Sequence, residues 1–255
     1  MKIRELVRPA GFTLVEVLVA MGVGTTVLLV MMTVMSMGTQ GYQEATRRID
    51  AMVEARSALS VLADDVSTLV GTSDDEFGWE EDDERFHQIW FLTIKPEDAQ
   101  DAENAIGDVC LVHYFTAVTP DAPIEDAVYS RKLYRRFWSS GEVIDRLFSG
   151  NLPSMSPNPE LAEAIAFNVT RFVAQPLMSS PQNGRMIEWS AGNGTPESLG
   201  LNLQVIDSDT AALFREESDW DLTGDLARQL IDDDDERESQ RGRDFRVNLS
   251  IRHED

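Results

Sequence analysis

An unbroken apolar run near the N-terminus constrains this chain more than any other feature. Residues 12–37 carry one charged side chain, Glu16, among hydrophobic residues and a few Gly, Ser and Thr. A helix over this run would be roughly 39 Å long at ~1.5 Å per residue, enough to cross a ~30 Å hydrocarbon core at a tilt. The run therefore predicts one membrane-spanning helix.

The residues before the apolar run indicate its orientation. Lys2, Arg4 and Arg8 make residues 1–11 basic, and basic flanks stay in the cytoplasm. An ordinary secretory signal would have a shorter apolar region with a small-residue cleavage site behind it. Here the run is longer, and the plausible processing site, Gly11, lies in front of it. We therefore expect a single-pass anchor with a cytoplasmic N-terminus.

Glu16 needs a physical reason to lie inside a membrane helix. An unpaired carboxylate there costs ~2.5–3.5 kcal/mol on insertion scales. Cleavage between Gly11 and Phe12 would create a cation at the same depth, the α-amine of Phe12. The amine of a neighbouring subunit would then pair with Glu16. The alternative is a plain anchor whose Glu16 reaches the membrane surface.

The sequence of residues 11–20, GFTLVEVLVA, resembles the class III signal of type IV pilins and type II secretion pseudopilins. The resemblance implies cleavage after Gly11 by the prepilin peptidase/N-methyltransferase, methylation of the Phe12 amine, and Glu16 as the assembly carboxylate. It also implies a bacterial inner-membrane protein with a periplasmic C-terminal domain, which later enters a pseudopilus. Ala20 and Gly24, spaced i,i+4, would permit close helix packing.

The helical pattern continues beyond the membrane run but becomes amphipathic. Apolar residues recur at spacings of three, four and seven: Tyr42, Ala45, Ile49, Met52, Leu59, Leu62, Val66 and Leu69. We predict one helix from about residue 12 to 70, with Gly38 and Gly41 as points where it could bend. Its apolar stripe needs a partner, and a β-sheet is the economical one.

Strand-like runs separated by Pro- and Gly-rich connections fill the rest of the chain. They cover residues 86–94, 109–118, 131–138, 164–174, 185–189, 199–206 and 245–251. The last run alternates apolar and polar residues, as a half-buried antiparallel strand does. The acidic stretch 72–84 is interpreted as a solvated loop, and residues 219–231 as a short helix.

The predicted fold class is α+β, a type IV pilin fold with a long N-terminal helix packed on antiparallel sheets. We expect four parts: a leader at 1–11, a transmembrane and filament-core helix at 12–37, its amphipathic continuation at 38–70, and a periplasmic β-rich domain at 71–255.

The order of elements in that domain resembles one member of the family, the J-type minor pseudopilin of type II secretion. The resemblance rests on the helix end at 58–66, the strand pair around 111–115 and 132–136, the runs 164–172 and 199–207, and the terminal strand. It implies a subunit at the filament tip, with other minor and major pseudopilins as partners. Acidic insertions at 72–84 and 232–238 depart from the family pattern.

Composition excludes several other functions. The chain has 22 Lys+Arg against 45 Asp+Glu, a net charge of −23, which disfavours nucleic-acid binding. Its single cysteine, Cys110, lies in an apolar run and cannot form an intramolecular disulfide.

No catalytic pattern is visible in the sequence. His87, His113 and His253 lie in different predicted strands without metal-ligand spacing, so we expect solvated or edge-strand histidines. There is no nucleophile elbow, phosphate-binding loop or dinucleotide fingerprint. The sequence therefore indicates that the protein is not an enzyme and has no cofactor.

Calcium is the one ligand that the sequence leaves open. Oxygen-rich segments suit Ca²⁺, and the weak candidates are Asp207, Asp209, Asp232 and Asp234, although the EF-hand order is absent. Two alternative functions also stay open. One is a minor pilin of a type IV pilus for adhesion or uptake, and the other is a membrane-anchored periplasmic binding module.

Overall fold

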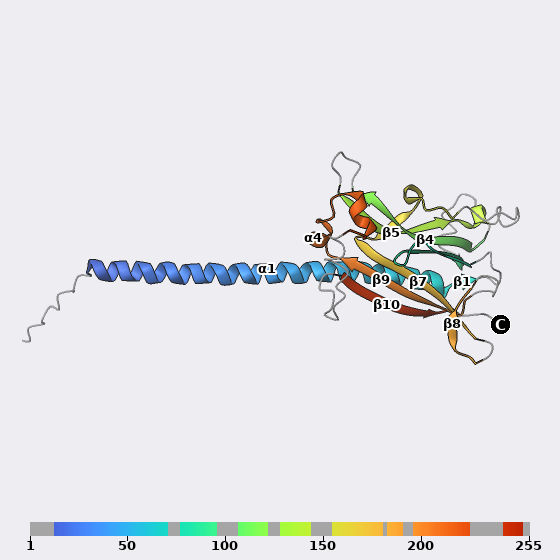
Figure 1. Ribbon diagram of the computed structural model, residues 1–255, viewed down its shortest axis with the longest axis horizontal. Helices are drawn as coiled ribbons and strands as arrows, with labels where there is room; N and C mark the ends of the chain where they lie inside the picture. The colour runs from blue at the N-terminus through green and yellow to red at the C-terminus, as the bar shows by residue number, and fades with distance from the viewer. Residues whose placement is uncertain are drawn as a thin grey trace, which may run out of the picture. The chain divides into compact units, whose positions relative to one another are not determined.

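The computed structural model describes residues 13–70, 77–95, 107–121, 128–143, 155–180, 183–190, 196–224 and 242–251 (Figure 1). The chain divides into two compact units, Met1–Arg47 and Arg48–Asp255. Helix α1, Leu14–Ser67, contributes its first part to one unit and its last part to the other.

Helix α1 runs through Gly38 and Gly41 without interruption, so neither glycine breaks it. In the part of α1 that belongs to the unit Met1–Arg47, threonine hydroxyls donate to the backbone carbonyl four residues earlier. Thr25 donates to the Met21 carbonyl at 2.8 Å, and Thr33 donates to the Leu29 carbonyl at 2.9 Å. These bonds satisfy the hydroxyls within the helix, which suits an apolar surrounding.

The helix ends at Ser67 rather than at residue 70. The Ser67 and Thr68 hydroxyls both donate to the Asp64 carbonyl, at 2.8 and 3.2 Å, and Ile94 N–H donates to the Thr68 carbonyl at 3.0 Å. These bonds draw the chain into a sheet, and Leu69–Val70 forms strand β1.

The first sheet is antiparallel and contains β1, β2 (Phe77–Glu81), β3 (His87–Ile94), β4 (Val109–Pro120), β5 (Tyr129–Trp138) and β6 (Glu163–Ala166). The strand order is β1-β3-β4-β5-β6, and β2 also pairs with β3.

Strand β2 lies inside residues 72–84, so the interpretation of that whole stretch as a loop is wrong. Phe77 is 1% exposed, and its ring centroid lies 5.2 Å from that of Trp189. The Trp90 indole covers the next residue, Gly78, so closely that a Cβ there would be 1.9 Å from a ring atom. Aromatic packing at the start of β2 thus forms a strand even though its last two residues, Glu80 and Glu81, are acidic and exposed.

The second sheet is also antiparallel. Its strands are β7 (Val169–Ser179), β8 (Met186–Glu188), β9 (Ser198–Ile206) and β10 (Gly242–Ser250), in the order β10-β9-β7-β8. The predicted strand over 164–174 is in fact two strands in different sheets. Asn168, at φ 53°, turns the chain between β6 and β7, and asparagine tolerates this left-handed conformation better than most residues.

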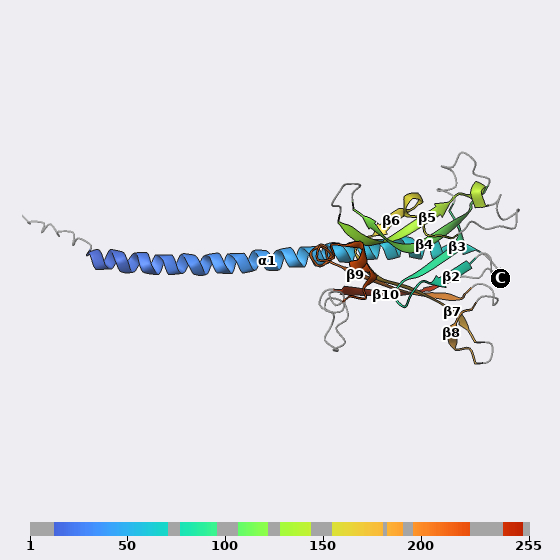
Figure 2. The same ribbon diagram turned by 45° about the horizontal axis from the view of Figure 1, so that its top comes forward.

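Residues Arg48–Asp255 share one main hydrophobic core. Ala55, Leu59, Leu62 and Val66 of α1 belong to it together with side chains of both sheets, such as Phe91 and Leu203. Figure 2 shows β4, β5 and β6 on one side of this part of α1, and β9 and β10 on the other. The amphipathic stripe predicted from the sequence thus packs on sheets, and the α+β fold class is confirmed.

Short elements outside the two sheets include η1 (Pro159–Leu161), α4 (Ser208–Ala211) and η2 (Glu217–Asp221). The helix predicted over 219–231 is corrected for its described part. There the chain forms the 3-10 helix η2, which ends at its C-cap Leu222 in a left-handed conformation, φ 57°. The side chain of Trp220, within this helix, is fully buried. Residues 225–231 lie outside the described residues.

Candidate functional site

The first turn of α1 is built by a reciprocal capping box. Thr13 N–H and Thr13 Oγ1 both donate to Glu16 Oε2 at 2.9 Å, and Glu16 N–H donates to Thr13 Oγ1 at 3.2 Å. Such a pair satisfies helix donors that have no intrahelical acceptor. The Thr-x-x-Glu spacing is visible in the sequence, and it explains why the helix begins at Leu14.

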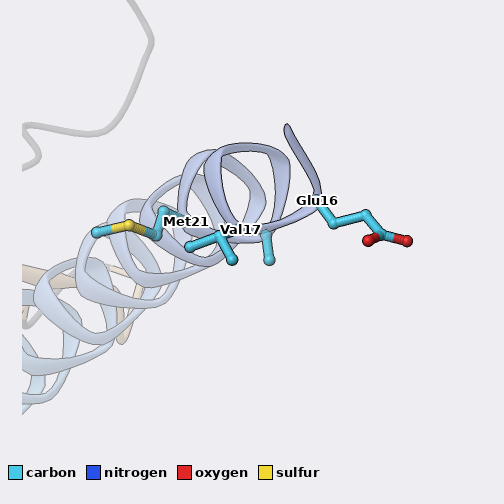
Figure 3. A pocket seen from close by; sticks show the side chains of 4 residues that line it. Glu16, Val17 and Met21 are labelled. Atoms are coloured by element: carbon cyan, nitrogen blue, oxygen red, sulfur yellow. The ribbon is translucent and has the colours of Figure 1, made fainter. Parts of the chain in front are cut away.

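This arrangement uses one carboxylate oxygen of Glu16 twice. Both hydrogen bonds reach Oε2, and among the described residues Oε1 accepts none. Glu16 is exposed, and Figure 3 shows its carboxylate extending away from the helix. A second donor from outside the chain can therefore approach Oε1 while the cap stays intact.

A shallow groove of about 510 Å³ adjoins Glu16 and is lined by Glu16, Val17, Ala20 and Met21. In Figure 3 the side chains of Val17 and Met21 flank it. Gly24 lies one turn beyond Ala20, and a Cβ placed on Gly24 would meet no atom within 4 Å. Glu16, Ala20 and Gly24 thus follow one another at i,i+4 spacing on one helix face. Gly11 and Phe12 lie outside the described residues.

The part of α1 that precedes Arg48 is largely apolar and exposed. The helix is long and apolar enough to cross a membrane, and its most apolar stretch is not buried against the rest of the described protein. Large side chains such as Leu14, Leu28 and Met32 are 77%, 64% and 72% exposed. A contiguous apolar surface of this size marks a membrane or protein contact. The helix is compatible with anchoring in the inner membrane.

Comparison with known families finds one match. Residues 8–32 match the model of the prokaryotic N-terminal methylation motif, which covers the Gly11–Glu16 segment and the start of α1. No curated protein and no solved structure matches the chain. The motif indicates a prepilin-like protein of the type IV pilin and pseudopilin kind. It points to a structural protein, to processing by a prepilin peptidase and to assembly with other pilin-like subunits.

A second polar cluster lies in the other unit, around Asp65, which is 1% exposed. Arg135 Nε donates to Asp65 Oδ2 at 2.7 Å, Tyr114 Oη donates to the same oxygen at 2.5 Å, and Lys95 Nζ lies 3.1 Å from Oδ1. Burial raises the pKa of Tyr114, and the nearby Asp65 carboxylate raises it further. The cluster joins α1 to β4, to β5 and to Lys95, which directly follows β3, so its role is to hold the helix on the sheet.

The described histidines are buried, so the expectation of solvated or edge-strand positions is wrong. His87 is 7% exposed and accepts from Trp79 Nε1 at 3.1 Å. His113 is fully buried, and its Nε2 lies 2.9 Å from Gln88 Oε1. Burial, aided by the charge of Arg136, lowers the pKa of His113 to about 4. His253 lies outside the described residues.

Asp207 caps helix α4. Its Oδ1 accepts from Asp209 N–H at 3.1 Å and Thr210 N–H at 3.0 Å, and its Oδ2 accepts from Thr210 Oγ1 at 2.7 Å. Within the described ranges, no group of three or more His, Cys, Asp or Glu side chains is arranged to hold a metal ion. Asp232 and Asp234 lie outside those ranges, and calcium stays the one ligand that the sequence leaves open.

Proposed function

We propose that this chain is a minor pseudopilin, a structural subunit of a type II secretion pseudopilus. In this proposal, prepilin peptidase cleaves after Gly11 and methylates the Phe12 amine, and the mature helix then packs with other pilin-like helices. The observation that carries the proposal is Glu16. It is a carboxylate on an exposed apolar helix, one turn after the processing segment. One of its oxygens accepts the cap hydrogen bonds, and the other accepts none from the residues that the structure describes.

The two oxygens of Glu16 allow cap and assembly contact to coexist. Oε2 accepts from Thr13, so the first turn needs no other partner. Cleavage before Phe12 would create an α-amine next to this turn, and the amine of a neighbouring subunit would reach Oε1. A charge-assisted N⁺–H···O⁻ bond is about twice as strong as a neutral one. In an apolar filament core it would offset the cost of burying both charges.

The face that carries Glu16 also suits close helix contact. Ala20 and Gly24 continue it with the two smallest side chains, and a Cβ at Gly24 would meet no described atom within 4 Å other than the adjacent backbone of its own helix. Small residues spaced by four let helix backbones approach in an apolar environment. We propose that a neighbouring helix occupies this face after Phe12 and Glu16 have paired between subunits.

The minor role in the filament is a proposal that concerns the sheet-bearing unit. This unit carries two antiparallel sheets, and the run 164–172, one of those on which the J-type resemblance rests, is divided between β6 of one sheet and β7 of the other. We propose specifically that the chain is the J-type subunit at the filament tip, and this part of the proposal rests on the sequence resemblance alone. Its partners would be other minor and major pseudopilins, and its C-terminal unit would be periplasmic.

Mass spectrometry of the mature N-terminus tests the processing step. After expression with a prepilin peptidase in a bacterial host, the protein should begin at Phe12 and carry one methyl group on its amine. Gly11→Leu should keep Met1 and the full leader. Ala10→Leu is the matched control, because residue 10 does not form part of the Gly11–Phe12 bond that is cleaved. An intact leader on the unaltered chain would refute the proposal.

A further inference from the structure

Strand β10 forms an open edge of the second sheet. It pairs with β9 over nine residues, from Gly242 opposite Ile206 to Ser250 opposite Ser198. Among the described residues no strand lies on its other side. An edge strand of this length presents backbone N–H and C=O groups that another chain can pair with.

Residues 244–250 lack the usual protection of such an edge. Their register with β9 contains no bulge, and the segment contains no proline. The residues that face the core, Phe245, Val247 and Leu249, are apolar and partly buried. The charges in this stretch are Asp244 and Arg246, whose carboxylate and guanidinium lie 4.0 Å apart and are 45% and 76% exposed.

These two charges make the edge complementary to itself. We propose that β10 pairs antiparallel with β10 of a second copy of this chain, about a twofold axis at Phe245. In this register Asp244 lies opposite Arg246 of the second copy, and Arg246 lies opposite its Asp244. Opposite charges in this cross-strand position stabilise a sheet, and like charges destabilise it.

Neighbouring registers lack this complementarity. An axis at Asp244 or at Arg246 would place that charged residue opposite its own copy. With the axis at Phe245, two four-stranded sheets become one continuous sheet with an isologous contact, the kind that closes a dimer. Membrane anchoring raises the effective concentration of the two copies.

Cysteine cross-linking of the full chain in lipid vesicles tests the register. Directly opposite Cα atoms in an antiparallel pair lie ~4.5–5.5 Å apart, within disulfide range. Phe245→Cys should therefore form a disulfide-linked dimer under mild oxidation. Val247→Cys is the matched control on the same face, because its two copies would lie roughly 13 Å apart. The unaltered chain, whose Cys110 is buried, gives the background.

Charge reversal tests the same contact without cysteines. Arg246→Asp and Asp244→Arg should each weaken dimerisation about tenfold in analytical ultracentrifugation of the detergent-solubilised chain. The double variant Asp244→Arg/Arg246→Asp restores both pairs and should restore the dimer. The proposal is overturned by equal cross-linking of the two cysteine variants, by a monomeric unaltered chain, or by a double variant no better than the singles.

Discussion

Arg135 of β5 donates from Nε to Oδ2 of Asp65 at 2.7 Å and from Nη2 to Oδ1 at 3.2 Å, so a two-point ion pair joins helix α1 to the first sheet. Asp65 is only 1% exposed, and Tyr114 and Lys95 share its oxygens. The pair adds a directional polar contact to the apolar packing of α1 on the sheets. We regard this contact as the anchor that joins the helix to the sheet-bearing unit.

Replacing Asp65 with Ala should therefore destabilise the protein strongly. The substitution removes the carboxylate that pairs with the Arg135 guanidinium, whose side chain is only 15% exposed, and breaking a buried pair in this way costs about 3–5 kcal/mol. Denaturant unfolding of the full chain in detergent, followed by tryptophan fluorescence, measures this loss. Asp64→Ala is the matched control. Asp64 also contacts Lys95, but its side chain is 71% exposed, so the cost should stay below about 1 kcal/mol. Equal losses in the two variants would contradict this role for Asp65.

Gly78 should not tolerate a side chain, because the Trp90 indole lies where its Cβ would be, 1.9 Å away. Gly78→Ala must displace the ring and should cost about 1–3 kcal/mol in unfolding free energy. Gly200→Ala is the control in the other sheet, since its nearest contact would be an ordinary 3.4 Å. Denaturant unfolding curves give the unfolding free energies of the two variants. Equal stability of Gly78→Ala and Gly200→Ala would show that the Trp90 ring can move away from residue 78 without cost.

His113 should make stability depend on pH. Its pKa is about 4 in the folded protein, against ~6.5 for an unfolded histidine. Between these values the unfolded chain binds the extra proton, so stability is full above about pH 6.5 and falls as the pH drops towards 4. The largest loss from this group is about 3 kcal/mol, from ~1.36 kcal/mol per pKa unit.

The histidine's share is found by difference. Unfolding free energies of the unaltered chain and of His113→Phe are compared at pH 7 and pH 4.5. Other groups titrate in both proteins, so the difference between their losses of unfolding free energy on acidification gives the contribution of His113. We expect the unaltered chain to lose more stability on acidification than the variant. Parallel losses would mean that His113 is not the group responsible.

The local features of this fold could be predicted from the sequence, but the long-range features could not. The apolar run, Glu16 and the amphipathic stripe are short-range patterns, and they predicted a long helix packed on antiparallel strands. The Thr13–Glu16 capping box is equally local, although the sequence analysis expects Glu16 either to pair with an amine or to reach the membrane surface. Its Thr-x-x-Glu spacing was the available signal.

The missed elements depend on contacts between distant residues. Strand β2 has few strand-like residues, and Phe77 is buried only because Phe91 and Trp189 surround it. The break between β6 and β7 falls at Asn168, within an apolar run that contains neither Gly nor Pro. The burial of His87 and His113 follows from strand pairing, and pairing order and register are set by long-range packing rather than by local pattern.

The central claim is that Glu16 acts through its charge at assembly, and Glu16→Gln tests it most directly. A glutamine keeps an oxygen for the Thr13 cap but cannot form an ion pair with the Phe12 amine of a neighbouring subunit. Glu16→Ala removes both, and Thr13→Ala weakens the cap while keeping the charge. The measurement is the fraction of each variant recovered in sheared pseudopili, with N-terminal processing verified by mass spectrometry. We predict that Glu16→Gln is cleaved and methylated normally, yet enters filaments about tenfold less, as Glu16→Ala does, whereas Thr13→Ala assembles. Incorporation of Glu16→Gln at the level of the unaltered chain would contradict the account.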